Sequence, residues 1–118
     1  MEEVRLRKPD EDLKSYLEAN TDIFTVDDVY NIHAEIAGHN DEDYWYWILE
    51  LRDKRIVLTS AWCDFTGWDC ASGGESNVAE NIEAAALLAP EIDKGRHIRR
   101  DLLAQVRGEL PFGIEVRN

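Results

Sequence analysis

The sequence predicts an α+β fold in which about four helices cover a small three-stranded antiparallel meander over about residues 44–72. Three observations predict this fold. Apolar residues alternate with a period of two from Tyr44 to Trp62, which is typical of β-strands. On both sides of that region, apolar residues recur three and four positions apart, as they do in amphipathic helices. Glycine and proline residues stand where one pattern gives way to the next.

Two helices are expected before the sheet. A polar start followed by apolar residues three and four apart predicts the first helix over about residues 9–19. The second is expected over about residues 26–37, with a capping box formed by Thr25 and Asp28 at its start and Gly38 as its C-terminal cap. The inner face of this second helix would consist of Val26, Val29, Tyr30, His33 and Ile36 or Ala37.

A β-hairpin is expected next. One alternating run covers residues 44–51 and another covers residues 56–62, and a two-residue turn at Asp53-Lys54 would join them. With this turn, the apolar residues of both strands fall on one face, so the register agrees with the burial pattern. The predicted cross-strand pairs are Leu51 with Ile56, Leu49 with Leu58, Trp47 with Ser60, and Trp45 with Trp62.

The segment Cys63-Asp64-Phe65-Thr66-Gly67-Trp68-Asp69-Cys70 predicts a second hairpin with Thr66-Gly67 at its tip and a positive φ at Gly67. Cys63 would then face Cys70 at a distance that a disulfide accepts, but intracellular disulfides are rare, so we expect two buried thiols. Asp64 would face Asp69, and like charges in such positions repel. A cation, a shared proton or an arginine could relieve this repulsion; alternatively, each aspartate bonds the loop backbone.

Two more helices are expected after the sheet. The pair Gly73-Gly74 would end the sheet, and Ser76 or Asn77 would cap a third helix. A fourth helix is expected over about residues 96–107, and the tail at residues 112–116 is either a short added strand or an irregular end. The apolar stripes are Val78, Ile82, Ala85, Ala86 and Ala89 in the third helix, and Ile98, Leu102, Leu103 and Val106 in the fourth.

The length of 118 residues and a hydrophobic content of 44% fit one globular domain. With 25 acidic and 13 basic side chains, the net charge is −12, which argues against direct binding of nucleic acid by the bulk surface. The sequence shows neither a secretory signal nor an apolar run of the roughly 20 residues that a membrane helix needs, so we expect a cytoplasmic protein without a membrane partner.

The charge is distributed unevenly. Residues 9–51 contain 12 acidic side chains and one lysine, and residues 64–93 contain seven acidic side chains and no basic one. Residues 94–107 reverse this balance with a net charge of +4. We expect a mostly acidic surface with one basic helix whose arginines are solvated or neutralise the acidic body.

Aromatic residues are concentrated in the predicted sheet, where seven of the 11 lie within residues 44–68. The face shared by Trp45, Trp47 and Trp62 predicts that these three side chains are in the core. Tyr44, Tyr46 and Trp68 would remain exposed and suit a protein interface, where tyrosine and tryptophan are favoured.

No catalytic or metal-binding pattern stands out. Cys63 and Cys70 lie further apart than the paired ligands of zinc sites, and the three histidines, His33, His39 and His97, form no recognisable pair. The Gly73-Gly74 segment lacks the lysine and the spacing of a phosphate-binding loop. We therefore expect no cofactor and no metal, and we favour a binding role over catalysis.

The segment from Cys63 to Cys70, after a tryptophan-rich hairpin, resembles a signature of small uncharacterised bacterial and phage proteins, Cys-Asp-Tyr-Thr-Gly-Trp-Asp-Cys. Phe65 is the one departure, and it loses only a hydroxyl group. The resemblance covers about 30 residues, from Tyr44 to Gly74, and implies that the hairpin tip is a shared structural unit. It brings no activity with it.

These observations favour a small acidic accessory protein of the kind that a phage could carry. It would bind a basic surface of a larger protein and inhibit or modulate that protein, and its negative charges could imitate those of nucleic acid. The alternative is a small enzyme or ligand-binding domain with its site around Asp64, Trp68, Asp69 and the two cysteines. The candidate binding residues are Asp41, Glu42, Asp43, Tyr44, Tyr46, Asp64, Trp68 and Asp69.

Overall fold

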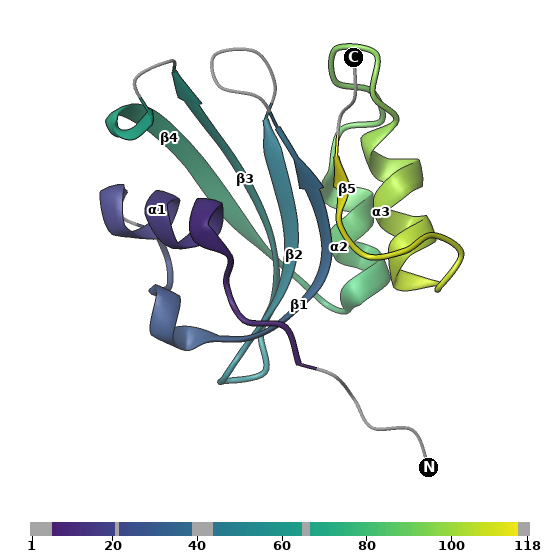
Figure 1. Cartoon of the computed structure of the whole chain (residues 1–118). Coiled ribbons are helices and arrows are strands. Elements are labelled where there is room, and N and C mark those ends of the chain that lie inside the picture. The colour runs from purple at the N-terminus through teal and green to yellow at the C-terminus, as the bar shows by residue number, and fades with distance from the viewer. Residues whose placement is uncertain (1–5, 21, 39–43, 65–66, 116–118) are drawn as a thin grey trace.

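Figure 1 shows the computed structural model of the chain. It describes residues 6–20, 22–38, 44–64 and 67–115, without the side chains at positions 64, 67, 69–71, 114 and 115. The elements are α1 (Glu11–Ala19), the 3₁₀ turn η1 (Val26–Asp28), β1 (Val29–Ala37), β2 (Trp45–Leu51), β3 (Ile56–Asp64), β4 (Gly67–Ala79), α2 (Ile82–Leu88), α3 (Ile98–Val106) and β5 (Ile114–Glu115).

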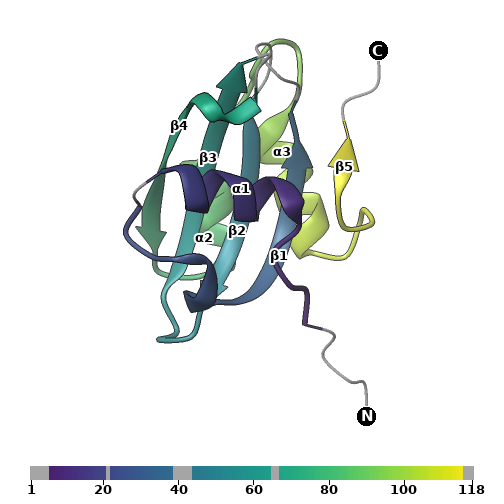
Figure 2. The ribbon, with the colours of Figure 1, turned by 60° about the vertical axis from the view of Figure 1, so that its left-hand side comes forward.

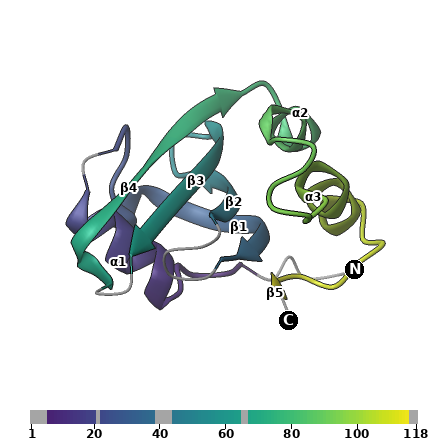
Figure 3. The same cartoon turned by 90° about the horizontal axis from the view of Figure 1, so that it is seen from above.

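The strands of the described residues form one sheet in the order β4-β3-β2-β1-β5. Neighbours among β1 to β4 are antiparallel, and the two-residue β5 runs parallel to β1. Helix α1 lies across one face of the sheet, and α2 and α3 cover the other, as Figures 2 and 3 show. The predicted α+β class is confirmed. The three-stranded meander with four helices is wrong, because the described chain has four antiparallel strands, the short β5 and three α-helices.

Each face of the sheet buries its own apolar core. The core between the sheet and α1 is the larger one and contains most of the tryptophans. The core between the sheet and helices α2 and α3 consists mainly of alanine, isoleucine and leucine. The alternation predicted for β2 is confirmed, but both of its faces are buried because helices cover both sides. The α1-side core contains Leu13, Tyr16, Phe24, Val29, Ile32, Trp45, Trp47, Leu49, Leu51, Val57, Ala61 and Cys63.

The predicted first helix is confirmed as α1, and Asp10 caps it by accepting a hydrogen bond from the backbone N–H of Leu13 at 2.9 Å. The predicted capping box also forms, with the Asp28 carboxylate accepting from the backbone N–H of Thr25 at 2.9 Å. It opens only the short turn η1, so the second predicted helix is wrong.

Strand β1 occupies the place of that second helix. Its register against β2 shifts between Val29 and Asn31 and again between Ile32 and Ala34. Such bulges turn side chains from one face of a sheet to the other. Val29 and Ile32 therefore enter the α1-side core, whereas Ala34 and Ile36 enter the opposite core. A bulged strand that is buried on both faces imitates the apolar spacing of a helix.

The hairpin turn between the hydrogen-bonded residues Leu51 and Arg55 contains three residues, 52–54, instead of the predicted two. The backbone N–H of Leu51 donates to the carbonyl oxygen of Arg55 at 2.9 Å, and Lys54 between them has a φ of 76°. A left-handed residue at the end of a three-residue turn is a common hairpin geometry. The additional loop residue shifts the whole register by one.

This shift overturns the predicted pairing. Trp45 lies opposite Ala61, and Trp62 consequently faces away from the α1-side core with 38% of its surface exposed. The prediction that Trp62 is a core residue is wrong, whereas Trp45 and Trp47 are buried as predicted. The observed pairs include Trp47 with Thr59, Leu49 with Val57, and Glu50 with Ile56, in place of the four predicted pairs.

Strand β4 continues through Gly73 and Gly74, so these glycines do not end the sheet. A Cβ atom at Gly74 would lie only 2.3 Å from the carbonyl oxygen of Ser60, so close strand packing requires glycine there. Helix α2 begins at Ile82 with Asn81 as its N-cap, later than the predicted start at Ser76 or Asn77.

Pairing near the tip of the β3–β4 hairpin differs from the prediction. Cys63 lies opposite Ser72, a register shift follows, and Asp64 lies opposite Gly67. The tip residues 65–66 and the Cys70 side chain lie outside the described residues, so the positive φ at Gly67 and the two thiols stay predictions. The predicted pairs Cys63–Cys70 and Asp64–Asp69 are wrong.

Helix α3 confirms the fourth predicted helix, and Gly108 follows it with a φ of 75°. The side-chain oxygen of Gln105 accepts hydrogen bonds from the backbone N–H groups of Glu35 and Gly113, both at 3.0 Å. Gln105 thereby holds the C-terminal segment beside β1, where β5 is a short added strand. Within the described residues, no helix has the length and apolar character needed to cross a membrane.

Candidate functional site

For five of the predicted binding residues, the structure does not describe where the side chain lies. Asp41, Glu42 and Asp43 lie outside the described residues, as do the side chains of Asp64 and Asp69. The acidic segment is nevertheless bounded by described backbone on both sides, since β1 ends before it and Tyr44 and β2 follow it. A binding role for these five residues stays a prediction.

Tyr46 does not reach the surface as expected, because α2 and α3 cover its face of β2. It is 4% exposed, its hydroxyl donates to Oδ2 of Asp93 at 3.1 Å, and the Arg96 guanidinium lies 5.8 Å from its ring. Burial, followed by the charge of Asp93, raises the pKa of Tyr46 far above its ordinary value. Tyr46 is therefore a buried hydrogen-bonding residue.

Trp68 is also engaged inside the molecule. Its ring packs on Trp45 with centroids 4.8 Å apart and on Tyr16 at 5.9 Å. Asp12 of α1 accepts a hydrogen bond from the indole N–H of Trp45 at 3.0 Å and lies 3.5 Å from that of Trp68. These contacts hold α1 on the sheet, and the prediction that Trp68 remains exposed is wrong.

A shallow groove opens at the end of the sheet where β2 begins and β3 ends. Its volume is about 300 Å³, and it lies on the α2 and α3 side, beyond the part of that face that the helices bury. Two aromatic side chains border it, Tyr44 at 40% exposure and Trp62 at 38%. We call it the Tyr44–Trp62 groove. It is lined by Tyr44, Ser60, Trp62, Gly74 and Glu75.

The neighbouring glycine Gly73 determines how Trp62 lies in this groove. A Cβ atom at Gly73 would be 3.0–3.1 Å from Nε1, Cε2 and Cζ2 of Trp62. The indole therefore lies against the bare backbone of β4 and leaves its other face to solvent. Glycine beside an aromatic residue on the neighbouring strand is the sequence signal that could have indicated this arrangement.

The electrostatics of the groove favour a cation. Glu75 is exposed, and none of the five lining residues is basic. Arg96 lies beside the groove, because its Nη2 donates to the Tyr44 carbonyl at 2.9 Å, but Asp93 neutralises this guanidinium through an ion pair of 2.7 Å. An ammonium or guanidinium group that entered the groove would meet aromatic surface and a carboxylate, both of which attract a cation.

A second cluster contains the most perturbed carboxyl group. Burial of Glu35, reinforced by a hydrogen bond to Asp10 and by the charge of Asp12, raises its pKa to about 8. Oε1 of Glu35 accepts a hydrogen bond from the indole N–H of Trp47 at 2.9 Å. Perturbed carboxyl groups are common at functional sites. Here, however, Glu35 already accepts from β2, and the neighbouring Asp12 of α1 accepts from the indole N–H groups of Trp45 in β2 and Trp68 in β4. We interpret this cluster as a set of hydrogen bonds that holds α1 against the sheet.

The described residues contain no group of three or more histidine, cysteine, aspartate or glutamate side chains that could hold a metal ion. His33 is paired with Glu50 at 2.9 Å, and His97 is exposed at the start of α3. Sequence reasoning found Tyr44 but missed Ser60 and Glu75, which become neighbours only through the pairing of β3 with β4.

Comparisons of the chain with models of protein families, with curated proteins and with solved structures found no match.

Proposed function

We propose that this protein binds a basic surface of a larger protein and inhibits or modulates it. The contact would be made by the Tyr44–Trp62 groove together with the acidic segment Asp41-Glu42-Asp43 that precedes Tyr44 in the chain. A lysine or arginine of the partner would enter the groove, and the acidic segment would face neighbouring positive charge.

The groove is the observation that carries this proposal. Tyrosine and tryptophan favour protein interfaces because they combine a large apolar surface with a polar group, and two of them flank one carboxylate here. The surrounding charge supports it, because a net charge of −12 attracts cationic proteins over long range and accelerates their encounter.

The experiment titrates the folded protein with an arginine-rich peptide and follows tryptophan fluorescence. Trp62→Ala and Glu75→Gln should each weaken binding at least threefold, because each removes one side of the cation site. Glu80→Gln is the matched control, since it removes the same charge from an exposed position outside the groove.

Equal loss of affinity in Glu75→Gln and Glu80→Gln would exclude the groove as the binding site, because the attraction would then be non-specific.

For the natural partner, the wild type and Trp62→Ala should be compared as baits in host extract. A partner that binds through the groove should be depleted from the variant, and equal recovery by both baits contradicts the proposal.

A further inference from the structure

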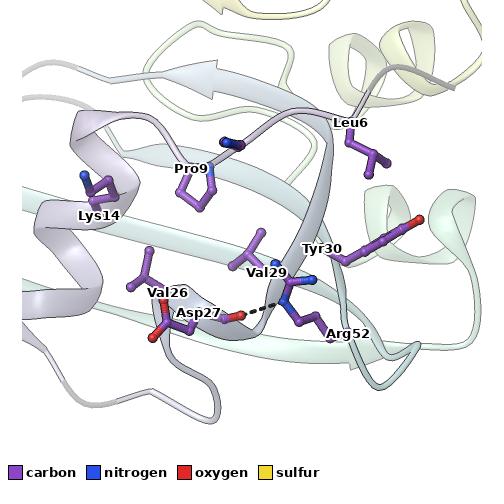
Figure 4. Close-up of a pocket in the computed structure, with 9 residues that line it drawn as sticks. Leu6, Pro9, Lys14, Val26, Asp27, Val29, Tyr30 and Arg52 are labelled. Carbon is purple, nitrogen blue, oxygen red and sulfur yellow. Dashed lines mark hydrogen bonds between the residues drawn. The ribbon is translucent and has the colours of Figure 1, made fainter.

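A second cavity lies at the opposite end of the sheet from the Tyr44–Trp62 groove. Its volume is about 410 Å³, within the usual range for small-molecule sites. Figure 4 shows that its walls come from four separate parts of the chain: the segment before α1, α1 itself, the turn η1 with the start of β1, and the loop after β2. The cavity therefore exists only when these four parts of the chain pack together in the folded protein.

The lining of this cavity is mainly apolar, with Leu6 and Pro9 on one side and Val26, Val29 and Tyr30 across from them. Leu6 and Tyr30 are 44% and 42% exposed, and in Figure 4 the two valines lie between them and Lys14. Exposed apolar side chains around a recess are a surface that an apolar group can cover.

Three cations also line the cavity: Lys8, Lys14 and Arg52. Among the described residues, no carboxylate lies within ion-pair distance of any of them, although acids outnumber bases almost two to one in this chain. Arg52 is held in place through Nε, which donates to the backbone carbonyl of Asp27 at 2.8 Å, so the Nη atoms keep their hydrogen-bonding capacity.

The one acid in the lining is Asp27, so the local charge is positive within a molecule of net charge −12. From this reversal of charge next to an apolar floor, we propose that the cavity binds a small organic carboxylate with an apolar body. Its carboxylate would pair with the cations of the lining, and its apolar part would cover Val26 and Val29. This proposal is independent of the function proposed for the groove.

The probe is 1-anilinonaphthalene-8-sulfonate, whose fluorescence increases when it binds an apolar site, and the competitors are octanoate, acetate and octanol. Octanoate should displace the probe from the folded protein, whereas acetate, which lacks the apolar body, and octanol, which lacks the charge, should do so at least tenfold more weakly. Displacement by octanol as effective as that by octanoate would overturn the proposal.

Lys14→Gln and Arg52→Gln should each weaken octanoate binding at least tenfold. Arg100→Gln makes the same charge change on α3, away from the cavity, and should leave the affinity unchanged. Thermal melts followed by circular dichroism establish that each variant is folded. No octanoate binding by the wild type, or an equal loss in Arg100→Gln, would show that the cavity is not such a site.

Discussion

At the scale of single residues, Glu35 retains its proton at neutral pH because its carboxyl group is partly buried and hydrogen-bonded to Asp10. The raised pKa fixes the sign of its effect on stability. Between the ordinary value of 4.5 and about 8, folded Glu35 holds a proton that unfolded Glu35 has lost. Its contribution to stability is therefore complete below 4.5 and is lost as the pH rises towards 8.

Glu35→Gln should remove this part of the pH dependence. Glutamine cannot ionise, yet its side-chain oxygen can still accept from Trp47 and its amide can donate to Asp10, like a protonated glutamate. Urea unfolding above pH 8 should find the variant more stable than the wild type by on the order of 1–3 kcal/mol, after allowance for solvent screening. Parallel stability curves for the two proteins from pH 5 to 8.5 would contradict the assignment.

The two adjacent glycines of β4 should respond differently to alanine. In Gly74→Ala the new methyl group meets backbone, 2.3 Å from the Ser60 carbonyl oxygen and 2.9 Å from Cα of Ala61, so we expect a loss of about 3 kcal/mol or more. In Gly73→Ala the three atoms nearest to the new methyl group all belong to the indole of Trp62, which is partly exposed and can move. Thermal melts should show a large decrease in Tm for Gly74→Ala and a small one for Gly73→Ala.

At the scale of elements, Arg96 joins the ends of two strands. Its Nη1 donates to the carbonyl of Ala37 at 3.1 Å and its Nη2 to that of Tyr44 at 2.9 Å, on either side of residues 38–43. The ion pair with Asp93 at 2.7 Å keeps this guanidinium in position, and its side chain is only 11% exposed. The predicted solvated role of the basic segment is therefore wrong for Arg96.

Arg96→Met should destabilise the protein by about 2–4 kcal/mol, because it leaves Asp93 and two carbonyl groups without their donor. Arg100→Met is the matched control, since the Arg100 side chain is 67% exposed and its loss should change the free energy of unfolding by less than about 0.5 kcal/mol. Chemical denaturation measures both. Similar losses in the two variants would mean that Arg96 does not join the strands.

At the scale of the whole molecule, the excess of negative charge would govern encounter with the basic partner that we propose. Association with that partner should slow by about tenfold or more as salt rises from low to physiological concentration, because ions screen long-range attraction. Reversing the charges of Asp41, Glu42 and Asp43 together should slow association further without unfolding the protein. Stopped-flow mixing measures these rates, and rates that change with neither salt nor charge reversal would exclude electrostatic docking.

The sequence by itself determined the net charge, the α+β class, helices α1 and α3, and the existence of the β2–β3 hairpin, since these depend on composition, local caps and alternation. It also indicated Tyr44 as an exposed aromatic residue. These features depend on neighbours that are close along the chain, which a sequence pattern displays directly.

Only the tertiary structure decided between helix and strand for residues 29–37, because a bulged strand with both faces covered has no clean period of two. It also decided the register, through the left-handed conformation of Lys54 that adds one residue to the loop and turns Trp62 outward. The groove and the cavity follow from these choices, because strand pairing and helix packing join side chains that are distant in sequence.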